Sequence, residues 1–254
     1  MRSGAGSDEY IGLAQRHYGI ISGFIFRHHV KAMRSTRRQT NRTLRSDIAH
    51  EAARLVVEGG CRSFAVARHK AAARMGLDNL RNLPDNVEIH SALIEYQRIF
   101  EGDRLCQRIE AMRREALAAM VVFEHYTPRL VGPVLYGSAC DHSPVTLHLY
   151  TDESESVTRL LCARKIDYRL TETTLNVSSK HRDVFPTYQV VNRDLDFELV
   201  VLGLAYLVHP PLSSLNGRPM KSADAADLSM LIDAEQALGS NVAGGEIASV
   251  ARNF

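Results

Sequence analysis

The chain has 254 residues and a mass of 28.3 kDa, which predicts one or two domains with a sizeable hydrophobic core. Its apolar content of 45% and charged content of 24% exclude a wholly disordered, collagen-like or fibrous protein. No stretch approaches the roughly 18 uncharged apolar residues of a membrane-spanning helix, so we expect no membrane segment.

The net charge of +2 conceals a basic N-terminal segment. Residues 1–46 carry nine Lys or Arg and two acidic residues, a net charge of +7, which leaves −5 for the remaining 208 residues. We expect this segment to be a disordered leader. Met33 opens its Arg-rich part, which favours Met33 as the natural start and residues 1–32 as an upstream extension; the alternative is a functional basic leader such as a targeting arm. A basic arm before a mildly acidic body can bind nucleic acid or an acidic partner.

Residues 47–127 are predicted to form a helical module of four helices. Asp47 can cap the first helix, which Gly59 and Gly60 end, and Asp85 and Glu88 have the spacing of a capping box. The expected helices cover residues 47–58, 64–75, 85–100 and 103–124. Apolar residues recur along each of them at helical spacing, which predicts a bundle-like packing of all four.

The second of these helices carries Arg68, Lys70 and Arg74. A helix, a glycine turn and a basic helix resemble a helix-turn-helix reader of DNA, and these cations are candidate nucleic-acid contacts. The alternative is a solvated basic face, because the helix offers mostly Ala where a sequence-specific reader needs Asn, Gln or Ser beside Arg.

The pattern changes from helical spacing to alternation after Pro128. Val145–Tyr150 alternates apolar and polar residues as a half-buried strand does, and Asp152 can cap a helix that reaches Lys165. Further strands are expected at 130–136, 166–170, 173–177, 184–191 and 197–203, and a last helix at 223–238. The prediction is an α+β domain over residues 128–238, with a mixed sheet and flanking helices, followed by a loose tail at 239–254.

The four cysteines are typical of buried thiols in a reducing compartment. Their spacing contains no CxxC or CxxH pair, so we expect neither a zinc site nor a disulfide framework. We therefore expect a cytoplasmic protein.

One motif carries a family resemblance. Leu135-Tyr136-Gly137-Ser138 ends the first expected strand, and Ser143-Pro144-Val145-Thr146-Leu147 opens the second. This strand, Gly-Ser turn and second strand resemble the core of the nucleotidyltransferase superfamily related to polymerase beta. The resemblance implies a nucleotidyltransferase-like fold in which Gly137 and Ser138 hold the phosphates of a nucleotide.

The metal ligands of that superfamily have no counterparts in this chain. Its members present Ser-Asp-x-Asp-Leu on the second strand, where the two Asp hold two Mg²⁺ ions that clamp the attacking and leaving oxygens. The two Asp positions fall here on Pro144 and Thr146. The third carboxylate of the family comes from a later strand, for which Asp196 and Glu198 are candidates, while Asp141 lies in the turn itself.

A longer part of the chain resembles a narrower group. The segments EAARLVVEGG, EIHSALIEYQRIF, PRLVGPVLYGSA, VTLHLYTDE and NGRPM are similar to a bacterial family of uncharacterised proteins, over residues 47–222. Its members are often filed as UDP-N-acetylmuramate–alanine ligase. That name does not fit this chain, because such a ligase needs three domains and a GxxxxGK[ST] loop for ATP.

These features predict a catalytically degenerate nucleotidyltransferase-fold protein that acts by binding a nucleotide, RNA or a protein partner. One alternative is an active nucleotidyltransferase that binds an NTP and Mg²⁺ through an unorthodox set, Asp141, Asp196 and Glu198. A second alternative is a non-specific nucleic-acid-binding protein that uses the basic arm and the Arg68–Arg74 helix.

Overall fold

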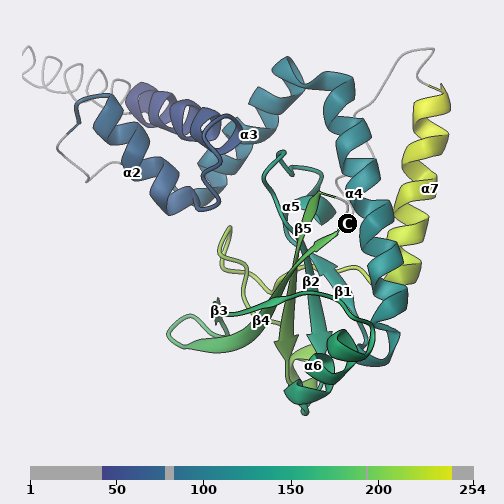
Figure 1. Ribbon diagram of the computed structural model, residues 1–254. Helices are drawn as coiled ribbons and strands as arrows, with labels where there is room; N and C mark the ends of the chain where they lie inside the picture. The colour runs from purple at the N-terminus through teal and green to yellow at the C-terminus, as the bar shows by residue number, and fades with distance from the viewer. Residues whose placement is uncertain (1–41, 78–82, 193, 242–254) are drawn as a thin grey trace, which may run out of the picture.

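The computed structural model describes residues 42–77, 83–192 and 194–241 (Figure 1). Helices come first along the chain. They are a first helix over residues 42–57, α2 (Phe64–Arg74), α3 (Asn86–Phe100) and α4 (Gly102–Val122). The capping box predicted at the start of α3 is confirmed, because the Asp85 carboxylate accepts the Glu88 N–H and the Glu88 carboxylate accepts the Asp85 N–H. Residues 1–41 of the predicted leader lie outside the described residues, while residues 42–46, expected to be disordered, form the start of the first helix.

A five-stranded mixed sheet follows the helices, so the predicted α+β class and the order of helices before sheet are confirmed. The strands are β1 (Arg129–Val131), β2 (Val145–Tyr150), β3 (Arg169–Asn176), β4 (Arg182–Asn192) and β5 (Leu195–Leu202). Their order is β1-β2-β5-β4-β3, in which β2 and β5 are parallel and the other neighbours are antiparallel. The connecting helices are η2 (Glu124–Tyr126), α5 (Pro133–Tyr136), α6 (Ser154–Ala163), η3 (Leu204–Leu207) and α7 (Ala225–Asn241).

The two faces of the sheet are covered by different elements. The alternating residues Val145, Leu147 and Leu149 of β2 enter one large core together with buried residues of β5, α4, α6 and α7. A smaller cluster lies on the other face, where Tyr206 of η3 packs against strand residues. The loop before α7 also reaches across the sheet, since it pairs with both β1 and the end of β3. The helices and this loop therefore cover both faces of the sheet at β2 and β5, whereas the edge strand β3 has no buried residue.

Helix α4 belongs with the sheet rather than with the three helices before it. Its buried residues Ile109, Met112, Ala116, Met120 and Phe123 are part of the sheet core. The first helix, α2 and α3 share a separate core, to which the loop after α5 contributes Cys140. The prediction of a single four-helix bundle is therefore wrong: the packing changes between α3 and α4. Phe100, the last residue of α3, continues the apolar spacing of that helix but is 67% exposed.

Several predicted boundaries also differ. The expected strand at 130–136 stops at Val131, because Gly132 adopts a φ of 78° and Pro133 then starts α5, a position that suits its fixed φ and missing N–H. Asp47 lies inside the first helix and does not cap it. Asp152 accepts the Leu204 N–H instead of capping α6. The two strands expected at 166–170 and 173–177 form the single strand β3.

No helix in the described ranges is long and apolar enough to cross a bilayer.

Candidate functional site

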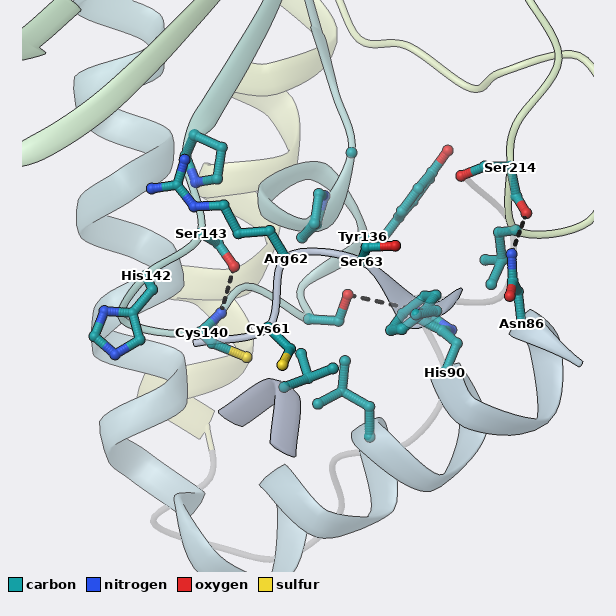
Figure 2. A pocket seen from close by; sticks show the side chains of 18 of the residues that line it. Cys61, Arg62, Ser63, Asn86, His90, Tyr136, Cys140, His142, Ser143 and Ser214 are labelled. Carbon is teal, nitrogen blue, oxygen red and sulfur yellow. Dashed lines mark hydrogen bonds between the residues drawn. The ribbon is translucent and has the colours of Figure 1, made fainter. Parts of the chain in front are cut away.

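A cavity of about 450 Å³ lies between the helical module, which comprises the first helix, α2 and α3, and the sheet domain, to which α4 belongs. Its volume is within the size range of small-molecule sites. Four segments form its walls: the turn after the first helix with the start of α2, the first two turns of α3, the stretch from Gly132 to Pro144, and the loop around Ser214. Figure 2 shows His142, Cys140 and Ser143 at one end of this cavity and Tyr136, Asn86 and Ser214 at the other. Ser138 of the predicted Gly-Ser turn therefore lines the cavity, whereas Gly137 is not among its lining residues.

The backbone N–H groups of the Gly-Ser turn point into the protein and not toward a ligand. Gly137 has a φ of 73° and ends α5, and its N–H donates to the Pro133 carbonyl. The Ser138 N–H donates to the same carbonyl, at 2.9 Å. Both amides therefore donate to a carbonyl of the protein itself and do not form a nest that could bind a phosphate.

A buried arginine supports this turn from α4. Arg113 is only 2% exposed, and its guanidinium donates to the carbonyls of Val134 at 3.0 Å and Leu135 at 2.8 Å. It also forms an ion pair with Glu235 of α7. One side chain thus joins α4, α5 and α7.

Gly137→Ala is expected to lower the free energy of unfolding by about 1–2 kcal/mol, because its positive φ disfavours every residue with a Cβ. Steric contact adds little, since a Cβ would lie 3.6 Å from the nearest guanidinium nitrogen of Arg113. Urea unfolding measures the loss. Gly137→Asn is the control and should lose less, because Asn tolerates this conformation better than Ala. Equal stability of Gly137→Ala and the original protein would contradict the assigned backbone.

The serine of the turn contacts a histidine from the helical module. Ser138 is 3% exposed, and its Oγ lies 3.2 Å from Nε2 of His90 on α3. Burial lowers the pKa of His90, so the ring is neutral at pH 7. Two turns further along α3, the buried Gln97 donates from Nε2 to the Ala139 carbonyl at 3.3 Å, while its Oε1 has no hydrogen-bond partner. Sequence reasoning missed both residues, although their spacing of seven places them on one face of α3.

Three more polar groups lie on the cavity wall. Asn86 donates to the Ser214 carbonyl at 2.7 Å, which ties α3 to the loop before α7. The Tyr136 oxygen accepts the Lys221 N–H, and burial raises the pKa of its phenol. Ser63, the N-cap of α2, makes no capping hydrogen bond. The hydroxyl groups of Ser63, from the helical module, and Tyr136, from the sheet domain, are therefore available to a ligand.

The candidate metal carboxylates do not meet at one point. Strand β5 runs parallel to β2 and places Glu198 beside Thr146. Arg62 binds both later-strand carboxylates, with nitrogen-to-oxygen distances of 2.6 Å to Asp196 and 3.7 Å to Glu198. Burial raises the pKa of Glu198 and Asp196 adds to this, while Arg62 opposes it. Asp141 is bound instead by Arg108 of α4, at 2.6 Å. Within the described ranges, no group of three or more His, Cys, Asp or Glu side chains could hold a metal ion.

The predicted nucleic-acid contacts on α2 are bound to protein groups. Arg68 donates to the Pro84 carbonyl at 3.0 Å, and Arg74 pairs with Glu51 of the first helix at 3.2 Å. The Lys70 ammonium lies 3.7 Å from the Cys61 sulfur. These contacts hold the helical module together, and nucleic-acid binding by α2 stays a prediction.

Comparison of the chain with protein-family models, with curated proteins and with solved structures found no match.

Proposed function

We propose that this chain is a catalytically degenerate protein of nucleotidyltransferase-like fold that binds a nucleoside or nucleotide in the cavity between its helical module and its sheet. The observation that carries the proposal is the cavity itself. It lies at the Gly-Ser turn, where the resembling superfamily holds its nucleotide, and segments from both modules enclose it.

The sheet supports the resemblance beyond the motif. In the superfamily a later strand supplies the third carboxylate to the metal site. Here β5 lies directly beside β2, and its Glu198 is in register with Thr146, which occupies a metal-ligand position of the family. A later strand with a carboxylate at this level is what the resemblance requires.

The same residues favour binding over nucleotidyl transfer. A two-metal site needs several carboxylates around a shared centre, whereas Pro144 and Thr146 offer none and Arg62 binds Asp196 and Glu198. Catalysis by a cysteine has no support either, because burial raises the pKa of the Cys140 thiol to about 11 and keeps it protonated at neutral pH.

The cavity walls suit a nucleoside. Phe64, Leu93 and Met220 supply apolar surface against which a base can pack. The Ser138 hydroxyl, the neutral His90 ring and the Tyr136 phenol can form hydrogen bonds with base edges and ribose hydroxyls. A ligand held this way needs no metal ion.

Isothermal titration calorimetry with the four common nucleosides and their nucleotides tests the proposal. At least one should bind with the same affinity in EDTA and in Mg²⁺. Ala65→Phe, which places a larger side chain on the cavity wall, should abolish that binding. Ala73→Phe is the matched control, because Ala73 is also exposed on α2 but lies outside the cavity wall.

A smaller effect is expected for Ser138→Ala. Loss of one hydroxyl partner should weaken binding about three- to tenfold, whereas Ser178→Ala, in the β3–β4 connection, should leave it unchanged. Two outcomes would contradict the proposal: binding that Ala65→Phe does not disturb, and binding that requires two Mg²⁺ ions.

A further inference from the structure

We propose, on the basis of the function proposed above, that the cavity selects the uncharged nucleoside over its phosphorylated forms. A triphosphate is the ligand that the nucleotidyltransferase-like fold alone suggests. The charges near the cavity instead disfavour a phosphate group.

Arg62 is the only Lys or Arg among the described residues that line the cavity, and its charge is already compensated. It faces two carboxylates, Asp196 at 2.6 Å and Glu198 at 3.7 Å, so this group of three carries an excess of negative charge. In Figure 2 its guanidinium points away from His90 and Tyr136. A phosphate that used Arg62 would have to displace a carboxylate or lie close to one.

Other groups that could bind a phosphate are also unavailable. The N–H groups of Gly137 and Ser138 donate to the Pro133 carbonyl, and burial keeps the His90 ring neutral at pH 7. The first turn of α2 does face the cavity, but a helix N-terminus contributes only about half a positive charge, which is less than the excess of carboxylate. An anion therefore gains little here, whereas an uncharged nucleoside keeps the apolar contacts and the hydroxyl partners.

The size of the preference follows from Coulomb's law. Neither carboxylate lines the cavity; both lie behind Arg62, which does. For scale, one uncompensated negative charge about 6 Å from a phosphate dianion in water-like surroundings lowers affinity about tenfold. We therefore expect the nucleoside to bind about tenfold more tightly than its 5′-monophosphate, and the triphosphate to bind no more tightly than the monophosphate.

Neutralising the two carboxylates should reverse this order. In the Asp196→Asn/Glu198→Gln double variant, the Arg62 charge is free to attract phosphate, so the monophosphate should bind at least as tightly as the nucleoside. Asp167→Asn/Glu172→Gln is the matched control: it makes the same change in net charge at exposed positions beside and on the edge strand β3, and should keep the original preference.

The experiment is calorimetric titration of the full chain and both double variants with each nucleoside, its monophosphate and its triphosphate, in EDTA at one ionic strength. Circular dichroism establishes that each variant is folded. Tighter binding of the nucleoside, with the preference lost in Asp196→Asn/Glu198→Gln alone, supports the inference. Tighter binding of a phosphorylated form by the unaltered chain overturns it and leaves the proposed function standing. Binding of neither form overturns the proposed function itself, and this inference with it.

Discussion

Arg113→Met is expected to lower the free energy of unfolding by about 2–4 kcal/mol, because two carbonyls lose their buried donor and each unsatisfied buried polar group costs about 1–3 kcal/mol. The substitution leaves the carbonyls of Val134 and Leu135 without their donor and Glu235 without its cation. Because the same guanidinium joins α4, α5 and α7, we expect the substitution to lower the stability of the whole protein rather than of one helix. Urea denaturation followed by circular dichroism measures it.

The neighbouring arginine provides the control. Arg114 is exposed and pairs with Glu110 one turn earlier on α4, so Arg114→Met should change stability by less than about 0.5 kcal/mol. Glu235→Gln should fall between the two, since it keeps a hydrogen-bond acceptor near Arg113. A similar stability for Arg113→Met and Arg114→Met would show that Arg113 does not hold these helices together.

Stability is also expected to fall as the pH is lowered from about 6.5 toward 4. His148 on β2 is 2% exposed, and burial lowers its pKa from the usual 6.5 to about 4. Between these values the unfolded chain binds a proton that the folded chain excludes, so acid favours unfolding. The full stabilisation is present above pH 6.5, and about 3 kcal/mol of it is lost by pH 4. The lowered pKa of His90 acts in the same direction.

Urea unfolding at a series of pH values measures this dependence. His148→Gln removes the largest titrating contribution and should make the curve clearly shallower between pH 6.5 and 4. His125→Gln is the control, because the His125 side chain is 84% exposed, and it should leave the curve as it is. An unchanged curve in His148→Gln would show that the imidazole titrates freely in the folded protein.

Much of the fold could be predicted from local sequence. The alternation in β2 predicted that Val145, Leu147 and Leu149 share one core face, and the Asp85–Glu88 capping box predicted where α3 begins. The expectation of a half-buried strand was wrong, because His148 and Tyr150 are buried on the other face of β2. Apolar spacing also predicted the buried face of α4, but it could not predict what covers that face. Spacing shows that a face is apolar without naming its partner, so the packing of α4 on the sheet could only come from the structure.

The candidate site depends on contacts that no local pattern contains. His90 and Ser138 are 48 residues apart, and Arg62 and Asp196 are 134 residues apart. The Gly-Ser motif was visible in the sequence, but its backbone geometry was not, because Gly132 and Pro133 convert the end of the expected strand into α5. No sequence pattern marked Arg62 either, since an arginine in a Gly-Gly-Cys-Arg segment is typical of an ordinary exposed turn.

A crystal structure of the chain grown with its tightest-binding nucleoside, in the presence of Mg²⁺, tests the central claim most directly. We predict the ligand in the cavity against His90, Ser138 and Tyr136, with Arg62 still bound to Asp196 and Glu198 and no metal ion between them. A Mg²⁺ ion on Asp196 and Glu198 with Arg62 displaced, or a nucleoside bound elsewhere beside an empty cavity, would contradict it.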